Sequence, residues 1–333
     1  MKKNLSFLIT GGTGSFGKAF VSNLIKSNKK IKRLVIYSRD ELKQFEMSQL
    51  FPKKKYPFIR FFIGDVRDQK RLKTAMENID VVIHAAALKQ VPSTEYNPFE
   101  AIKTNIIGAQ NVIEAAISKN VKNVIALSTD KAASPINLYG ATKLCSDKLF
   151  ISANNIVGKK TIKFSVVRYG NVFGSRGSVV PFFLKEKKRG ILPITDSNMT
   201  RFNISLKEGA NLVLWVLKNA LGGEIFVPKL QSYRITDLAK AIGPNCRYPI
   251  VGVRQGEKIH EEMITASDSQ NTLELKNIYV ILPFKNDNFL SYYRKKFNSS
   301  KVKKDFTYKS NSTNKFLSIN DLKKILKDYE KKK

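Results

Sequence analysis

The 333-residue sequence has two cysteines, two histidines and one tryptophan. It is therefore poor in cysteine and histidine, the residues that build disulfide frameworks and zinc sites. Cys145 and Cys246 are too few for a disulfide scaffold and are typical of a chain kept in a reducing compartment. His84 and His260 are the only histidines, and no C-x-x-C motif occurs. The sequence therefore predicts no metal site.

Long apolar runs are missing as well. The run from Leu5 to Ile9 stops at Thr10-Gly11-Gly12, which is too short for the apolar region of a signal peptide. No stretch approaches the roughly 20 apolar residues that span a bilayer. We therefore expect a cytoplasmic protein with no membrane span.

Acidic residues are scarce: 27 Asp and Glu face 59 Lys and Arg, giving a formal net charge of +32. Such a charge can indicate binding to nucleic acid, to anionic lipid or to phosphorylated ligands. The lysines are spread along the chain, whereas nucleic-acid-binding proteins usually gather their cations in a patch with aromatic residues. We expect a Lys-rich enzyme surface and no nucleic-acid partner. The alternative is a basic nucleic-acid-binding or regulatory protein that keeps an inactive dinucleotide fold.

Short β-rich runs alternate with helical patterns, and this alternation sets the fold class. Strands are predicted at 7–9, 34–37, 59–63, 81–83, 124–127 and 164–167. Helices are predicted at 15–28, 39–50, 98–119, 137–154 and 207–221, and a last one is capped by Ser318 with Asp321. Strands without polar alternation indicate a parallel sheet covered on both faces. The sequence predicts an α/β fold, a Rossmann-like doubly wound parallel sheet with a smaller mixed C-terminal substrate lobe.

The expected domains follow from where this alternation loosens. We expect residues 1–170 to form an NADP-binding Rossmann domain, with 203–240 packing back on it. Residues 171–202 and 241–333 form the substrate lobe and a basic tail in this interpretation.

A G-x-x-G-x-x-G pattern lies between the first strand and the first helix. Gly11 allows a tight turn, Gly14 lets backbone amides approach a pyrophosphate, and Gly17 lets the helix pack closely on the strand. The helix N-terminus then faces the phosphates. The cofactor-binding residues expected in this segment are Gly11, Thr13, Gly14, Ser15, Phe16 and Gly17.

The end of the second strand predicts which nicotinamide cofactor binds. Ser38 and Arg39 come first there, followed by Asp40 and by Lys43 one turn later. Cations at this position favour a ribose 2′-phosphate, and hence NADP. Ser38 with Glu41 is also expected to form a capping box for the following helix.

Further cofactor contacts are expected after the third and fourth strands. Asp65 and Val66 lie where an adenine contact is expected, and Ala85 and Ala86 supply small side chains against which a cofactor can lie. Val172 is expected to complete this set.

Tyr139 and Lys143 are four residues apart on one predicted helix, so their side chains share a face. An ammonium beside a phenol lowers the pKa of the phenol and makes tyrosine usable as a base near neutral pH. The pair follows a strand that ends in Ser128-Thr129-Asp130-Lys131, downstream of the nucleotide-binding pattern. This setting predicts an oxidoreductase-type site with Tyr139 and Lys143 also contacting the cofactor.

Together these motifs resemble the extended short-chain dehydrogenase/reductase superfamily. More narrowly, the chain is similar to the configuration-inverting UDP-N-acetylglucosamine 4,6-dehydratases of pseudaminic-acid and related nucleotide-sugar pathways. The similarity runs from about residue 5 to residue 326 and weakens in the tail. The motifs that carry it are the runs 37–44, 84–92, 129–132, 168–172, 174–178, 199–202 and 256–258.

The resemblance implies a redox-neutral dehydration that yields UDP-2-acetamido-2,6-dideoxy-β-L-arabino-hex-4-ulose. Thr129 would hold the sugar O4 while Tyr139, activated by Lys143, takes its proton. Lys131 would be the C5 base and Asp130 the C6 acid. Lysine acts as a base only when neutral, so the pKa of Lys131 is expected to fall through burial or nearby cations such as Lys89.

The resemblance also implies UDP-N-acetylglucosamine as substrate and a homo-oligomer, with a hexamer as one form. It assigns the UDP-sugar to Lys89, Asn171, Arg201, Arg254 and Glu257. Ser134, Asn203 and Gln255 depart from the usual pattern and leave the shape of the acetamido pocket open. A UDP-sugar 4-epimerase of the same superfamily is the alternative enzyme, because it needs Tyr139 and Lys143 but no acid–base pair for water loss.

Overall fold

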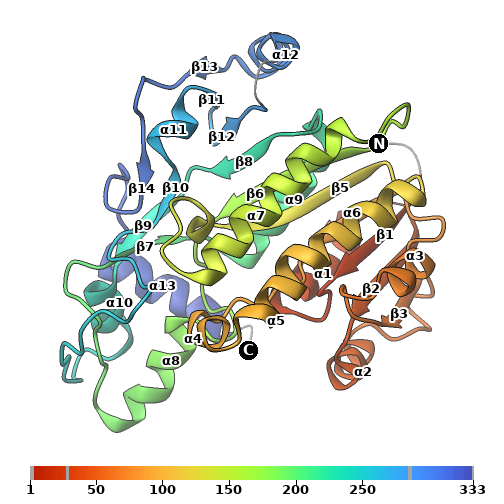
Figure 1. Cartoon of the computed structure of the whole chain (residues 1–333). Helices are drawn as coiled ribbons and strands as arrows, with labels where there is room; N and C mark the ends of the chain where they lie inside the picture. The colour runs from red at the N-terminus through yellow and green to blue at the C-terminus, as the bar shows by residue number, and fades with distance from the viewer. Residues whose placement is uncertain (1–3, 28–29, 284–286, 332–333) are drawn as a thin grey trace.

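Buried parallel strands form the centre of the fold in the computed structural model, which describes residues 4–27, 30–283 and 287–331 (Figure 1). Their order is β3-β2-β1-β4-β5-β6, the doubly wound order in which ligands bind at the carboxyl ends of the strands, beside the switch between β1 and β4. The predicted fold class is confirmed. The bounds are β1 (Leu5–Thr10), β2 (Ile31–Ser38), β3 (Ile59–Ile63), β4 (Val81–His84), β5 (Asn123–Thr129) and β6 (Lys163–Tyr169).

Four later strands extend this sheet beyond β6. β8 (Ile225–Pro228) pairs parallel with β6. β12 (Ile278–Ile281), β11 (Thr272–Glu274) and β13 (Ser300–Lys301) then add antiparallel pairs. These last three strands come from the segment that the sequence assigns to the substrate lobe, but they lie in the central sheet. The division into two domains stays a prediction.

Helices cover both faces of the sheet (Figure 1). One buried cluster joins the strands to α1 (Ser15–Lys26), α9 (Leu206–Asn219) and α12 (Asp287–Phe297). A second cluster joins them to α3 (Gln69–Ala75), α6 (Gly108–Ser118) and α7 (Leu138–Ser152). The strands bury apolar side chains on both faces because each face has its own helical layer. None of the described helices is long and apolar enough to cross a membrane.

The predicted helix at 98–119 contains a π-helical turn. It runs as α5 (Pro98–Ile102), η1 (Lys103–Ile107) and α6 without a break. The buried Asn105 in this turn accepts from the Leu88 amide at 2.8 Å and donates to the Leu88 carbonyl at 2.9 Å. The π turn therefore anchors the loop that carries Lys89, in keeping with the frequent placement of such turns at functional sites.

A smaller group of elements lies beside the sheet. α8 (Val179–Glu186), α10 (Ile235–Ile242) and α13 (Ile319–Glu330) share a third buried cluster. β7 (Thr200–Asn203) pairs with β9 (Gln231–Arg234), and β10 (Glu262–Ile264) with β14 (Tyr308–Lys309). The predicted capping box of Ser318 and Asp321 is present on α13. The remaining elements are α2 (Glu41–Leu50), α4 (Val91–Tyr96), α11 (Ala266–Ser269), η2 (Asp130–Ala132), η3 (Ala153–Asn155) and η4 (Lys187–Arg189).

The start of α2 differs from the sequence prediction. Asp40, not Ser38, is its N-cap, and the Asp40 side chain accepts a hydrogen bond from the Lys43 amide. Ser38 cannot take this role because it ends β2, where its hydroxyl accepts from Thr13. In α1 the helix reaches Lys26, and the predicted end at Asn28 lies outside the described residues.

Candidate active site

The glycine turn after β1 forms a close-packed cradle. Gly11 has φ +63°, and a Cβ there would lie 2.9 Å from the backbone of Ala86. A Cβ on Gly17 would lie 2.1 Å from the Gly12 carbonyl oxygen. Gly14 caps α1 without a side-chain hydrogen bond, so the amides of the first turn stay available to an anion. Thr13, Ser15 and Phe16 lie on this turn, and the cradle fits the pyrophosphate of a dinucleotide.

The residues expected around the ribose gather at the end of β2. The Thr13 hydroxyl donates to the Ser38 hydroxyl at 3.0 Å. Asp40 forms an ion pair with Lys43, and hydrogen bonds from Lys43 lower the pKa of Asp40. The Arg39 guanidinium is more than half exposed and lies 3.7 Å from the Asp65 carboxylate. Arg39 therefore has room to turn toward a ligand phosphate, whereas Lys43 is already paired.

Asp65 is fixed at the end of β3 by two arginines. Arg67 donates to its carboxylate at 2.8 Å, and Arg39 lies near the same oxygen. Burial acts to raise the pKa of Asp65, but Arg67 and Arg39 outweigh it and lower the pKa. Asp65 is therefore ionised at neutral pH, and the adjacent Val66 is buried against α6.

The expected cofactor wall after β4 rests on a buried histidine. The amides of Ala85 and Ala86 lie 3.2 and 3.3 Å from the Thr10 hydroxyl, which also contacts His84 Nδ1 at 2.8 Å. Burial, with the Lys143 charge, lowers the pKa of His84 to about 3. His84 is neutral near pH 7 and acts as a structural support for this wall.

The centre of the site is a lysine held between two buried carboxylates. Lys131 Nζ lies 3.0 Å from Asp130 Oδ1 and 3.0 Å from Glu261 Oε1. Asp130 is fully buried and also accepts from the Thr129 hydroxyl at 2.9 Å. Within the described part of the chain, Asp130 Oδ2 and Glu261 Oε2 have no hydrogen-bond partner. The arrangement leaves one buried oxygen of each carboxylate without a partner, while the other oxygen of each contacts the lysine.

The expectation for the pKa of Lys131 is wrong in this structure. Burial acts to lower that pKa, but Asp130 and Glu261 outweigh burial and raise it. Burial and the Lys131 charge lower the pKa of Lys89, but repulsion between the two lysines does not outweigh the two carboxylates around Lys131. The sequence argument did not include Glu261, because no local sequence pattern links this residue to Lys131.

The pKa of Asp130 is also raised, and in a carboxyl group this shift suits an acid. Burial raises its pKa, and Glu261 adds to the rise, while Lys131 opposes both. A carboxyl group with a raised pKa can hold a proton near neutral pH and donate it.

Tyr139 lies on the first turn of α7, next to this cluster. Burial raises its pKa to about 12, and the largest lowering contribution comes from Lys131. The sequence argument expected Lys143 to bring the pKa of Tyr139 below that of a free phenol. That expectation is wrong in this structure, because burial outweighs the lowering contributions, the largest of which comes from Lys131. Lys143 is buried on the same helix and donates to the Ser146 hydroxyl at 3.5 Å, and burial lowers its pKa.

A buried network of hydrogen bonds and ion pairs beneath α7 supports Tyr139 and Lys143, the two catalytic candidates on this helix. Ser128 donates to Asp147 at 2.6 Å, and the Arg168 guanidinium lies 3.3 Å from the same carboxylate oxygen. Arg168 also donates to the Met263 carbonyl at 3.0 Å. The network joins β5, α7 and β6 to the β10 segment and so fixes α7 against the strand that ends at Thr129.

Arg201 connects the lysine cluster with the expected uridine side. Its guanidinium donates to the backbone carbonyls of Thr200 and Ile259 at 2.8 and 3.0 Å. It lies 3.5 Å from Glu257 and 3.7 Å from Glu261. Arg201 is therefore buried and oriented before a ligand binds.

The other predicted substrate residues surround the same region less tightly. Arg254 is exposed, and its carbonyl accepts from the Glu257 amide at 3.1 Å in a turn. Lys89 donates to the Arg176 carbonyl at 3.3 Å. Asn171 is bonded through its carbonyl to Ile204, and its buried side-chain oxygen has no partner in the ranges that the structure describes. Val172 follows it and bridges to Ile204.

Comparison with known proteins shows the family of the chain. The model of the polysaccharide biosynthesis protein family matches residues 7–283. A UDP-N-acetylglucosamine 4,6-dehydratase (inverting) from Campylobacter jejuni is 54% identical over 99% of this chain and 98% of the relative. The chain belongs to the polysaccharide biosynthesis protein family, within the extended short-chain dehydrogenases/reductases.

Other members of this family and superfamily give the range of activities around the chain. A UDP-glucose 4-epimerase from Rickettsia akari is 41% identical over 96% of this chain and 95% of the relative. The solved structure of Pen from Bacillus thuringiensis is 37% identical, covers 99% of each chain and has a TM-score of 0.89. Both matches cover nearly the whole of this chain, and the second shows that the fold is shared over that length.

Three residues that support this candidate site were not predicted from the sequence. Glu261 holds Lys131, Asn105 anchors the loop of Lys89, and Asn137 caps α7 and contacts the 254–257 turn. Asn137 precedes the Tyr139 helix, so an N-cap pattern could have found it. Glu261 could not be found in this way, because it lies far along the chain in a segment without a regular pattern.

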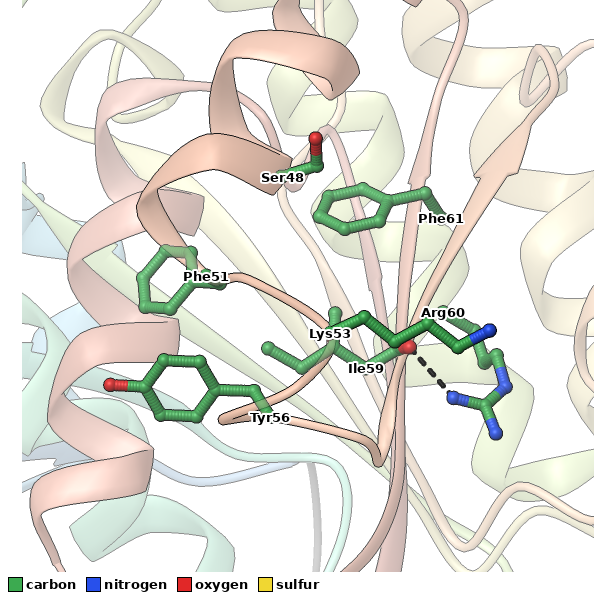
Figure 2. A pocket seen from close by; sticks show the side chains of 7 residues that line it. All are labelled: Ser48, Phe51, Lys53, Tyr56, Ile59, Arg60 and Phe61. Carbon is green, nitrogen blue, oxygen red and sulfur yellow. Dashed lines mark hydrogen bonds between the residues drawn. The ribbon is translucent and has the colours of Figure 1, made fainter.

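A separate cavity of about 390 Å³ lies at the other edge of the sheet, between the end of α2 and β3 (Figure 2). None of the predicted site residues lines it, so it belongs to a different region of the surface. No group of metal-binding side chains is found among residues 4–27, 30–283 and 287–331. The lining residues are Ser48, Phe51, Lys53, Tyr56, Ile59, Arg60 and Phe61.

Proposed function

We propose that this family member is a C5-inverting UDP-N-acetylglucosamine 4,6-dehydratase that uses NADP. The observation that carries the proposal is the contact of Asp130 with Lys131 beside Tyr139, an acid and a base next to the oxidation site. The close relative from Campylobacter jejuni carries the same activity in its name.

The cofactor site supports a nicotinamide dinucleotide. The Gly11–Gly17 cradle and the free amides of α1 fit its pyrophosphate, and Arg39 is the residue we propose for the 2′-phosphate of NADP. When bound, such a cofactor would supply a hydride acceptor for C4 of the sugar and a hydride donor for C6. Return of the hydride to C6 requires a proton at C5, and its delivery from solvent on the face opposite Lys131 would give the inverted configuration. Ala85, Ala86 and Val172 would line the nicotinamide side, with Tyr139 and Lys143 next to it.

Thr129 and Tyr139 would act on the C4 hydroxyl. The Thr129 hydroxyl lies at the end of β5 and can hold O4, while Tyr139 takes the hydroxyl proton as a general base. The Lys131 charge lowers the pKa of Tyr139 and thereby favours this first step. A charged Lys131 in the resting enzyme is therefore useful to the oxidation.

Lys131 and Asp130 would exchange one proton before water is lost. Their hydrogen bond is 3.0 Å long, and transfer of the proton from Nζ to the carboxylate gives a neutral amine and a neutral acid. Lys131 can then remove the C5 proton, while Asp130 protonates the departing C6 oxygen, which leaves as water. This step restores the ammonium and the carboxylate, so the raised pKa of Lys131 does not prevent its role.

The UDP moiety would bind across the turn at 254–257. We propose that Arg201 and Arg254 contact the diphosphate, because guanidinium groups bind phosphate oxygens bidentately. Glu257 would accept from ribose hydroxyls, with Asn171 and Lys89 near the sugar. Arg201 is already oriented by the Thr200 and Ile259 carbonyls.

The named epimerase relatives make a UDP-sugar 4-epimerase the second candidate function. An epimerase needs no C5 base and no C6 acid, so Asp130 and Lys131 favour the dehydratase. Purified protein incubated with UDP-N-acetylglucosamine in heavy water separates the two by NMR. We expect deuterium at C5 and a new C6 methyl signal; formation of UDP-N-acetylgalactosamine with intact C6 hydroxyl would overturn the proposal.

We further propose a cytoplasmic location and a homo-oligomeric assembly, with a hexamer as one form. We also propose that the product enters a pathway of the pseudaminic-acid type. The two cysteines are free thiols, which fits a reducing compartment.

A further inference from the structure

Glu261 is a buried carboxylate that makes its contacts with two cations of the site. It is 1% exposed, its Oε1 lies 3.0 Å from Lys131 Nζ, and the same oxygen lies 3.7 Å from Arg201 Nε. Its second oxygen has no hydrogen-bond partner among the described residues. A buried group with a free oxygen is costly to keep, so its placement needs a reason.

The backbone fixes Glu261 independently of its side chain. Its amide donates to the Ser310 hydroxyl at 2.9 Å, and its carbonyl accepts from the Ser310 amide at 2.8 Å. The next residue, Glu262, accepts from the Ser134 hydroxyl at 3.0 Å and lies 3.9 Å from Lys309. The two adjacent glutamates therefore have different partners, and the side chain of Glu261 contacts Lys131.

Folding stability alone does not explain this glutamate. Burying charged groups costs several kcal/mol for each ion, and well-packed apolar side chains in place of a buried ion pair are often at least as stable. Asp130 already supplies Lys131 with one counter-ion at 3.0 Å. The second carboxylate is therefore better explained by what Lys131 does.

We propose that Glu261 is the positioning residue of Lys131 in the dehydration, an inference that rests on the proposed function. It would hold Nζ between the two carboxylates while the proton passes to Asp130. It would stay ionised and stabilise the ammonium that forms when Lys131 takes the C5 proton. A buried carboxylate that orients a general base and stabilises its charged form is an established way to accelerate proton transfer.

The charge balance around Glu261 fixes the expected pH effect. Removing its negative charge lowers the pKa of Lys131, because Glu261 contributes to raising it. The rate then depends on a weaker and less well held base, so its maximum falls. Glu261 also raises the pKa of Asp130. Without Glu261 the Lys131–Asp130 pair takes up an extra proton only at lower pH, and the acid-side limb of the pH profile moves to lower pH. The charged and titratable groups in and around the cluster of Lys131, Arg201 and Glu261 are Asp130, Tyr233, Glu257, Lys258, His260, Glu262 and Lys309.

The test compares Glu261→Gln with the matched neighbour Glu262→Gln. For Glu261→Gln we expect kcat to fall roughly 10²-fold, KM for UDP-N-acetylglucosamine to stay within about 3-fold, and the acid-side limb to move to lower pH. Glu262→Gln should keep the wild-type kcat and profile. Glu261→Asp, which keeps the charge on a shorter side chain, should recover part of kcat and leave the limb near its wild-type position.

Several outcomes would overturn the role of Glu261 and leave the dehydratase standing. They are a kcat within about 3-fold of wild type in Glu261→Gln, an unshifted pH profile, or an equal loss in Glu262→Gln. If a thermal melt shows that Glu261→Gln does not fold, Glu261→Asp decides instead: a kcat clearly below wild type with an unshifted acid-side limb supports the role, and a kcat within about 3-fold of wild type overturns it. A wild-type enzyme that forms no dehydrated product overturns the proposed function itself, and the role of Glu261 with it.

Discussion

The Asn137 side-chain amide donates a hydrogen bond to the Gly256 carbonyl at 2.7 Å. The same side chain accepts from the Gly140 amide at 2.8 Å and so caps α7. Gly256 has φ +75°, and a Cβ there would lie 2.9 Å from the Asn137 Cβ. One asparagine thus connects the helix of Tyr139 to the turn proposed to bind UDP.

Substitutions at Asn137 should separate its two roles. Asn137→Asp keeps a good N-cap but loses the donor to Gly256, so we expect KM for the UDP-sugar to rise about 5-fold with little change in melting temperature. Asn137→Ala loses both interactions and should also destabilise the protein by about 1 kcal/mol. Steady-state kinetics and thermal melts check this, and a wild-type KM in Asn137→Asp would contradict it.

Lys131→Ala should stop dehydration but leave slow, partial oxidation at C4. A missing general base costs roughly 10² to 10⁴-fold in rate. The oxidation is read as reduced-cofactor absorbance, and the water loss as the C6 methyl signal. Near-normal turnover in Lys131→Ala would show that the C5 base is a different residue.

For the same variant we predict that the remaining C4 oxidation depends on pH differently from that of the wild type. Lys131 makes the largest lowering contribution to the pKa of Tyr139, which burial raises to about 12. Without that charge the pKa of Tyr139 rises, so the oxidation in Lys131→Ala should require higher pH than in the wild type. Tyr139→Phe is the control and should remove both steps at every pH; an unshifted oxidation profile would exclude Lys131 as the influence on Tyr139.

Arg39→Ala should change cofactor preference. Arg39 is exposed at the end of β2 and interacts with Asp65 at 3.7 Å, so its loss should weaken NADP binding about 10-fold or more and leave NAD binding within about 2-fold. Titration calorimetry with each cofactor measures this. Arg60→Ala, at the distant cavity, serves as the matched control. Equal weakening for NADP and NAD would argue against a 2′-phosphate contact.

Two glycine-to-alanine substitutions should have opposite signs. In Gly17→Ala the new Cβ meets the Gly12 carbonyl oxygen at 2.1 Å, which forces α1 away from β1, so we expect a loss of at least about 2 kcal/mol and of cofactor binding. In Gly209→Ala, inside α9, the nearest atom lies 3.8 Å away, so helix propensity should add up to about 1 kcal/mol. Urea denaturation of both variants checks the two signs.

His84 should make stability depend on pH. Its pKa is lowered from 6.5 to about 3 in the folded protein, so between these pH values the unfolded chain binds more protons. The free energy of unfolding should therefore fall as pH decreases through this window, by at most about 1.4 kcal/mol per pH unit from this residue. His84→Gln should show a shallower dependence in urea denaturation at pH 4.5 and 6.5, and an equal slope would contradict the assignment.

The local parts of the site could be predicted from the sequence. The Gly11–Gly17 turn follows from steric needs within one βα unit, and Tyr139 and Lys143 share a helix face by spacing alone. The strands were recognisable because both faces of the sheet are buried, which removes polar residues from them. Such features depend on neighbours that are close in sequence.

The remaining features depend on contacts between distant segments. The raised pKa of Lys131 comes from Glu261 as well as from its neighbour Asp130, and the former contact is made only by the tertiary fold. The strands β11–β13 join the central sheet through the pairing of β12 with β8, which the short runs of 272–301 do not reveal. The sequence pattern favours Ser38 as the N-cap of α2, because it does not show that β2 extends to this residue.

The contact between Lys131 and Glu261 also has a consequence for biosynthesis. A ribosome releases Lys131 well before it releases Glu261, with α7, β6 and α9 lying between them. Contacts between such distant segments form late and slowly. A nascent or truncated chain that ends before Glu261 can hold the nucleotide-binding turn complete while its lysine lacks one counter-ion. The ion-pair cluster around Lys131 is therefore complete only when the segment that carries Glu261 has folded onto it.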